Sequence, residues 1–137
     1  AIAVIGAAKR RINPEEMPEP WGFTHVVQAG NTAYIGGVIG MDRAGTITAK
    51  GGVDGQLGVL YANLEAGLRS VGGTASSVVK TTTYCTRPEY LSVVGQASRE
   101  FYGDTPPTSS TVVAQGLVTP EMLVEIEAIA HIERADR

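Results

Sequence analysis

Two glutamates near the end of the chain have the residue type and spacing to take part in catalysis. Glu125 and Glu127 lie in the run VEIEAIAHI, whose alternation is typical of a β-strand. Because side chains alternate between the two faces of a strand, both carboxylates and His131 share one face. A carboxylate in a partly dry cleft can act as a general base on water, since burial raises its pKa. The same pattern is common on solvent-exposed faces, so the spacing alone leaves both interpretations open.

The other residues with reactive side chains have weaker patterns. We expect His25 and His131 to be structural or exposed and predict no metal site, because no second histidine, cysteine pair or compact acidic loop accompanies either one. Cys85 precedes a predicted helix, where the pKa of a thiol can be lowered, but a buried strand cysteine is the preferred interpretation. The glycines of GGVDGQLG follow no buried parallel strand, and the hydroxyls of TSST have no recognised base nearby. These patterns therefore favour neither a phosphate-binding loop nor a serine hydrolase.

Length and charge limit the classes of protein to consider. The 137 residues fit a single domain spanning residues 1–137, and the net charge of -3 with scattered Lys and Arg predicts no nucleic-acid partner. The opening run AIAVIGAA is too short to cross a membrane and lacks the charge-first order of a signal peptide. A single cysteine excludes an intramolecular disulfide. We therefore expect a cytoplasmic protein without a membrane partner.

The first third of the chain predicts a lead-in followed by a β-hairpin. Residues 1–20 end in a Pro-rich, acidic stretch, and the sequence leaves open whether this lead-in adds a strand or covers a cleft. Residues 23–30 and 32–40 are two β-like runs joined at a Gly-Asn pair, and a third short strand is expected within residues 41–50. Gly36 and Gly37 interrupt the second run, which indicates either a bulge or a close approach of a ligand to the backbone.

The remainder predicts two helices and three strands. Apolar residues recur at helical spacing over residues 54–71, and the spacing of Thr86 and Glu89 predicts a capping box for a second helix that ends at Gly103. The expected strands are residues 76–86, 105–115 and 122–134, the last two joined by a short turn. The buried stripe of the second helix is expected to be Leu91, Val94, Ala97 or Ser98, and Phe101. This order indicates an α+β fold in which two helices cover one face of a mixed sheet.

Four segments resemble a known family. HVVQAGNTAYIGGVIG, SSVVKTTTY, EFYGDTPPTSSTVV and VEIEAIA resemble the Rid family, the reactive-intermediate deaminases of the YjgF type, over roughly residues 21–133. The resemblance implies a chorismate-mutase-like fold assembled as a homotrimer, with the sheets forming a central barrel. It also implies a small-molecule ligand in the clefts between adjacent subunits. In the deaminating branch, water hydrolyses an enamine or imine to a 2-keto acid and ammonia without a cofactor.

The resemblance also suggests roles for individual residues. The family's catalytic glutamate, which orients the attacking water, falls on Glu125, and the glycine whose backbone lines the pocket falls on Gly37. A backbone amide near Thr111 would bind the ligand's carboxylate. The family arginine that grips this carboxylate falls on Ser109, and the pocket tyrosine falls on Phe23, which keeps an aromatic wall without the hydroxyl.

The absence of the arginine at Ser109 changes the expected ligand. A bidentate arginine contact is charge-assisted, and its loss costs on the order of 1.5 to 3 kcal/mol of binding. Small 2-imino acids are therefore expected to be poor substrates, unless Arg43, Lys80 or Arg87 enters the cleft or the ligand is larger and less anionic. The sequence leaves two functions open: an imine or enamine deaminase, and a metabolite-binding or regulatory trimer without turnover.

Overall fold

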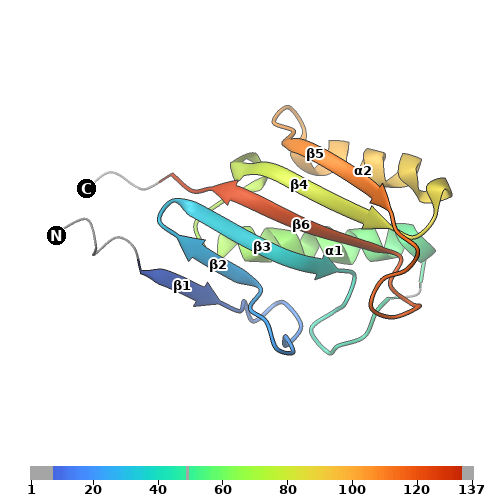
Figure 1. Ribbon diagram of the computed structural model, residues 1–137, viewed down its shortest axis with the longest axis horizontal. Helices are drawn as coiled ribbons and strands as arrows, with labels where there is room; N and C mark the ends of the chain where they lie inside the picture. Colours follow the sequence, from blue (N-terminus) through green and yellow to red (C-terminus); the bar gives the residue numbers. More distant parts are fainter. Residues whose placement is uncertain (1–7, 49, 134–137) are drawn as a thin grey trace.

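The computed structural model describes residues 8–48 and 50–133. They form one six-stranded sheet in the order β1-β2-β3-β6-β4-β5, and Figure 1 shows the two longer helices on one face of it. The strands are β1 (Lys9–Ile12), β2 (Val26–Ala29), β3 (Thr32–Ile39), β4 (Val78–Cys85), β5 (Thr108–Val113) and β6 (Val124–His131). The helices are α1 (Gly52–Arg69) and α2 (Leu91–Tyr102), with single 3-10 turns at Ala75–Ser77 and Pro88–Tyr90. The predicted α+β layer is confirmed.

The predicted hairpin forms, and the lead-in extends it. β2 and β3 pair antiparallel around Gly30, which adopts a φ of +61° that is readily accessible only to glycine. β1 then pairs antiparallel with β2, so part of the lead-in adds an edge strand to the sheet. The amide of His25 donates to Oδ1 of Asn13 at 2.9 Å, which ties the segment after β1 to the strand beside it.

The core lies between the sheet and α1. β6 alternates as predicted: Val124, Ile126, Ala128 and Ala130 are buried, while Glu127 and His131 are exposed on the opposite face. The predicted apolar stripe of α1 packs against this aliphatic face. Its fully or nearly fully buried leucines are Leu57, Leu60, Leu64 and Leu68. Burial of a leucine side chain contributes about 1.5 to 3 kcal/mol, so this layer fixes which face of β6 meets water.

Two local predictions were wrong. The third short strand is a single bridge between Met41 and Ile47, because the Asp42 side chain accepts the amide of Thr46 at 2.9 Å and closes a turn instead. The capping box at Thr86 does not form. The backbone amide of Thr86 donates to the carbonyl of Leu123 at 3.1 Å. Thr86 therefore still pairs with the segment before β6 at the position where the helix was expected to begin. α2 begins at Leu91, after the 3-10 turn.

The second helix and the last strands also differ from expectation in detail. α2 buries Val94 as predicted, but Leu91 is 42% exposed and the other buried residue is Tyr102. Tyr102 and Phe101 pack with their ring centroids 4.9 Å apart near the end of α2. β5 and β6 are not neighbours joined by a short turn. β4 lies between them, parallel to β5 and antiparallel to β6. In the part of the chain that the structure describes, no helix is long and apolar enough to cross a membrane.

Candidate functional site

The carboxylate of Glu125 lies against the backbone of Gly37. Glu125 begins the exposed face of β6, where its Cα is paired with Ile39 of β3, and the register of β3 shifts between Ile35 and Val38. Gly37 sits in this shift with a φ of +43°, and a β-carbon built on it would lie 2.9 Å from Oε2 of Glu125. The interrupted strand is therefore a bulge, and it is also the place where a polar group approaches the backbone closely.

A pocket of about 650 Å³ opens at this point. We call it the Glu125 pocket; its walls come from β3, β6, the segment before β2, α1 and the connection before β6. The residues that line it are Met17, Pro18, Glu19, Trp21, Phe23, Thr24, His25, Gly36, Gly37, Val38, Ile39, Met41, Asn63, Val118, Met122 and Glu125. Three of the five residues singled out from the sequence, Phe23, Gly37 and Glu125, thus share one cavity. Most of the other walls are apolar.

Burial raises the pKa of Glu125, and the neighbouring charge of Glu127 raises it further. Glu127 is exposed and accepts a hydrogen bond from the hydroxyl of Tyr84 at 2.7 Å. This hydrogen bond and the nearby carboxylates raise the pKa of Tyr84, so the tyrosine stays a donor. The two glutamates therefore differ in environment. Glu125 has the half-buried position that suits a general base, whereas Glu127 is held by a partner on the open face.

The rim of the Glu125 pocket carries large apolar side chains in contact with solvent. Trp21 is 88% exposed, Val118 is 85% exposed and Phe23 is 52% exposed. Below them, His25 is 4% exposed, its ring packs edge-on against Phe23 with centroids 5.3 Å apart, and its Nε2 lies 2.6 Å from the carbonyl oxygen of Pro18. His25 is thus a buried residue that contacts the preceding loop, which is the structural one of the two alternatives that the sequence left open.

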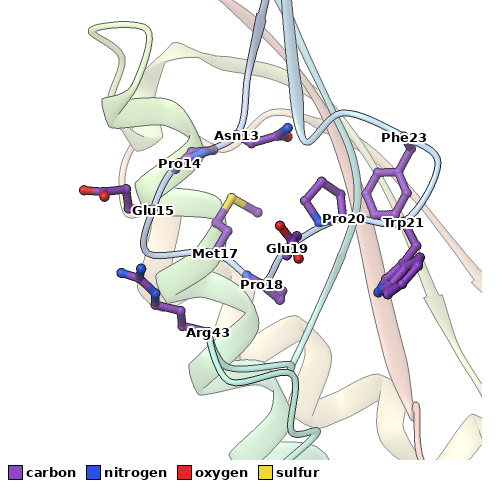
Figure 2. A pocket seen from close by; sticks show the side chains of 10 residues that line it. All are labelled: Asn13, Pro14, Glu15, Met17, Pro18, Glu19, Pro20, Trp21, Phe23 and Arg43. Carbon is purple, nitrogen blue, oxygen red and sulfur yellow. The ribbon is translucent and has the colours of Figure 1, made fainter.

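A second pocket of about 670 Å³ adjoins the first. Figure 2 shows Trp21 and Phe23 at one end of it and Glu15 and Arg43 at the other. The Pro-rich loop, residues 13–23, supplies most of its walls. Met17, which is 4% exposed, lines both pockets, so this loop forms the partition between them. The lead-in therefore both adds a strand and shapes a cleft.

Ser109 and Thr111 do not join the other predicted site residues within one chain. Both lie on β5, paired with Thr81 and Thr83 of β4, and all six side chains of β5 are exposed. β4 separates this strand from β6, and neither residue lines the Glu125 pocket. The edge of the sheet beyond β5 is open in the part of the chain that the structure describes.

None of the cations considered as substitutes for the missing arginine lines the Glu125 pocket. Arg43 lines the adjoining pocket instead. Arg87 forms an exposed ion pair with Glu89 at 3.3 Å, and Lys80 lies on β4 opposite Thr108. Among the described lining residues, the ionisable side chains are Glu19, His25 and Glu125, so the walls carry two carboxylates and no guanidinium or ammonium group.

Two buried amides that the sequence analysis missed hold the site in place. Asn63 of α1 donates from Nδ2 to the carbonyls of Ile39 and Met41, at 3.0 and 2.8 Å, and so fixes the end of β3. Gln56 donates to the carbonyl of Glu121 at 2.7 Å and accepts the amide of Leu123 at 2.9 Å, which fixes the chain just before β6. Both amides lie seven residues apart on the apolar face of a helix, and that placement was the available signal.

The remaining candidates are not part of the site. Cys85 is buried in β4, and burial raises the pKa of its thiol, which agrees with the structural interpretation and not with a reactive thiolate. Within residues 8–48 and 50–133, no three His, Cys, Asp or Glu side chains are grouped in a way that could hold a metal ion.

Known proteins resemble this chain over most of its length. The family model described as endoribonuclease L-PSP matches residues 15–132. A RutC family protein from Pyrococcus horikoshii is 29% identical, with 91% of this chain and 99% of that protein covered. A 2-iminobutanoate/2-iminopropanoate deaminase from Dermatophagoides farinae is 30% identical, with 91% and 98% covered. The crystal structure of a protein of the conserved Rid family from Yersinia pestis has a TM-score of 0.85 at 27% identity, covering 91% of this chain and 100% of that one. The chain therefore belongs to the endoribonuclease L-PSP family, which includes the Rid proteins of the YjgF type.

Proposed function

We propose that this protein is a cofactor-independent hydrolase that deaminates an imine or enamine in clefts between the subunits of a homotrimer. The observation that carries the proposal is the position of the Glu125 carboxylate. It is half-buried in a largely apolar pocket and lies against the backbone of Gly37, which has no side chain to displace it. The name of the Dermatophagoides farinae relative, a 2-iminobutanoate/2-iminopropanoate deaminase, supports the reaction class. Burial raises the pKa of Glu125, which brings the carboxylate closer to the basicity that a base on water needs.

The reaction needs only water and proton transfers. Glu125 accepts a proton from a water molecule as the oxygen adds to the carbon of the C=N bond, and a tetrahedral carbinolamine forms. The protonated Glu125 returns this proton to the nitrogen, and the carboxylate then transfers the hydroxyl proton of the carbinolamine to the same nitrogen. The C–N bond breaks as the C=O bond forms, ammonia leaves, and Glu125 is again a carboxylate. The carbon becomes a carbonyl, so one imine and one water give one carbonyl compound and one ammonia. Holding the water beside the imine carbon supplies much of the acceleration through orientation.

A second copy of the chain would complete the cleft. Ser109 and Thr111 lie on an open sheet edge whose six side chains are exposed, which suits contact with another subunit. We propose that β5 of the partner subunit borders the Glu125 pocket, with Phe23 as an aromatic wall and the backbone near Thr111 of the partner subunit as a hydrogen-bond donor to the ligand.

The shared cleft is tested by the mass and by mixing variants. Light scattering should give a mass of about three times the 14.3 kDa chain. A mass of one chain contradicts the shared cleft. Glu125→Gln and Ser109→Glu should each lose activity as homotrimers. After they are unfolded together and refolded, about a quarter of the clefts in a random mixture combine an intact Glu125 with an intact Ser109, so activity should partly return. No recovery in the mixture contradicts the proposed contribution of β5.

The hydrolase itself is tested with imines made in the assay. An amino-acid oxidase acting on a panel of amino acids generates 2-imino acids, and an amine oxidase generates imines without a carboxylate. Wild-type protein should accelerate the loss of the imine absorbance and the release of ammonia for at least one of them. If no imine of either kind reacts faster than it does in buffer alone, the proposed reaction is wrong.

One observation favours the second function, a binding trimer without turnover. The Glu125 pocket has no lysine or arginine among its described walls, so the bidentate arginine contact that fixes a carboxylate-bearing substrate is absent there. Ser109→Arg distinguishes the two functions. If this variant hydrolyses 2-iminopropanoate while the wild type binds ligands but turns over none of the imines, the natural protein is a binding module built on the same pocket.

A further inference from the structure

We infer that the Glu125 pocket selects an amine or imine that carries an aromatic or bulky apolar group and no carboxylate. The inference deepens the proposed function and rests on it for turnover. Selection at the level of binding does not depend on that function.

The charges of the pocket disfavour an anionic ligand. Its described ionisable walls are Glu19, His25 and Glu125, so a ligand carboxylate entering it would approach two carboxylates, and the imidazole of His25 would be its one ionisable partner among these walls. Burying an unpaired charge costs several kcal/mol, and like charges add to that cost. A protonated imine or amine meets the opposite situation, since Glu125 supplies a half-buried counter-charge.

The position of Arg43 strengthens this conclusion. Its side chain lines the adjoining pocket together with Glu15, as Figure 2 shows. The two pockets share five lining residues of the Pro-rich loop, including the buried Met17, and Arg43 lines the adjoining pocket but not the Glu125 pocket. No arginine is thus among the described residues that line the Glu125 pocket. The strand that the partner subunit would add, β5, has the sequence TSSTVV and carries no charged side chain.

The walls indicate what the rest of the ligand is. Trp21, Phe23 and Val118 present large apolar surfaces at the rim, and Val38, Ile39 and Met122 line the interior. Aromatic faces pack against hydrocarbon groups and also attract cations, so they suit both the apolar group and the ammonium group of such a ligand. A volume of about 650 Å³ lies within the range that accommodates drug-sized ligands.

Binding can be measured directly because Trp21 is the single tryptophan of the chain and lines the pocket. We expect phenethylamine to shift the tryptophan fluorescence and to bind at least about tenfold more tightly than 3-phenylpropanoate, which exchanges the ammonium for a carboxylate. Ethylamine, which lacks the ring, should also bind at least about tenfold more weakly. Equal or tighter binding of 3-phenylpropanoate, or equal binding of ethylamine, overturns the inference. Glu125→Gln should weaken phenethylamine binding and leave that of 3-phenylpropanoate unchanged or tighter.

Turnover of a matched pair separates this inference from the proposed function. An amine oxidase converts phenethylamine to 2-phenylethanimine, and an amino-acid oxidase converts phenylalanine to 2-imino-3-phenylpropanoate, the same skeleton with a carboxylate. We expect the first imine to be hydrolysed with at least a tenfold higher kcat/KM. If both react and the second is faster, the hydrolase stands and the selectivity is wrong. If neither reacts while phenethylamine still binds preferentially, the selectivity stands and the hydrolase is wrong.

Discussion

A β-carbon on Gly37 would lie 2.9 Å from Oε2 of Glu125, so the strand bulge and the carboxylate occupy one site that only glycine leaves open. The relationship joins residues that are far apart in the sequence, and it depends on the pairing of β3 with β6. It places the carboxylate at the wall of the pocket, with exposed backbone beside it.

Gly37→Ala should impair both stability and catalysis. Its φ of +43° disfavours an L-residue by about 1 to 2 kcal/mol, and the methyl group would displace the Glu125 carboxylate. Gly36→Ala is the matched control for stability, because a β-carbon there meets no atom within 4 Å and its φ is not positive. Urea unfolding and imine hydrolysis measure the two effects. Equal behaviour of the two variants contradicts the proposed contact.

Glu127→Gln should shift the acid limb of the pH–rate profile to lower pH. Burial is the main cause of the raised pKa of Glu125, and the charge of Glu127 is the second, so removing that charge lowers the pKa. A general base works when deprotonated, and its activity then persists into more acidic solution. Tyr84→Phe removes the hydrogen-bond donor and keeps the charge of Glu127, so it should not move the limb downward. An unchanged profile in Glu127→Gln shows that another group limits the rate.

Glu125→Gln should raise the thermal stability of the protein at neutral pH. Because the folded-state pKa of Glu125 is raised, its contribution to stability is fully present below the unfolded pKa and is lost as pH rises through the folded pKa. Glutamine does not titrate, so the gain in Tm should be largest at neutral pH. It should shrink as the pH falls and Glu125 of the wild type becomes protonated. Glu133→Gln, an exposed change near the end of the described chain, serves as control. A lower Tm for Glu125→Gln at neutral pH would contradict the claim that burial of the Glu125 carboxylate destabilises the folded protein.

Gln56→Ala should lower the free energy of unfolding by about 1 to 3 kcal/mol, because it leaves the carbonyl of Glu121 and the amide of Leu123 without their buried partner. Gln96→Ala on the exposed side of α2 should change it by less than about 0.5 kcal/mol. Chemical denaturation compares the two variants. If Gln56→Ala lowers the free energy of unfolding no more than Gln96→Ala does, other contacts position the segment that precedes β6.

Alternation along β6 predicted which residues meet the helices and which meet solvent, since the two-residue period of a strand is a local property. It could not predict that Glu125 and Glu127 have different environments, because that difference comes from the bulge in β3 and the hydroxyl of Tyr84 on β4. The insertion of β6 between β3 and β4 is a long-range pairing, and the expectation of adjacent β5 and β6 failed for the same reason.

The Pro-rich loop shows a further limit of sequence patterns. Its prolines predict irregular structure but not where that structure packs. Its position depends on the burial of Met17 and on the contacts of Asn13 and Pro18 with His25, which lies beyond the loop in the sequence. Pocket walls of this kind are assembled from several elements. The capping box at Thr86 failed because a sheet hydrogen bond occupied its backbone, a competition that local spacing does not reveal.

The role of Glu125 as the base that activates water is tested most directly by the rate of imine hydrolysis. Wild type and Glu125→Gln are compared as folded proteins at neutral pH, with the imine generated in the assay. Replacing a general base is expected to lower kcat by about 100- to 10,000-fold, while circular dichroism and the oligomeric mass remain those of the wild type. A folded Glu125→Gln variant that hydrolyses the imine at the wild-type rate would contradict the assignment of Glu125 as the residue that activates water.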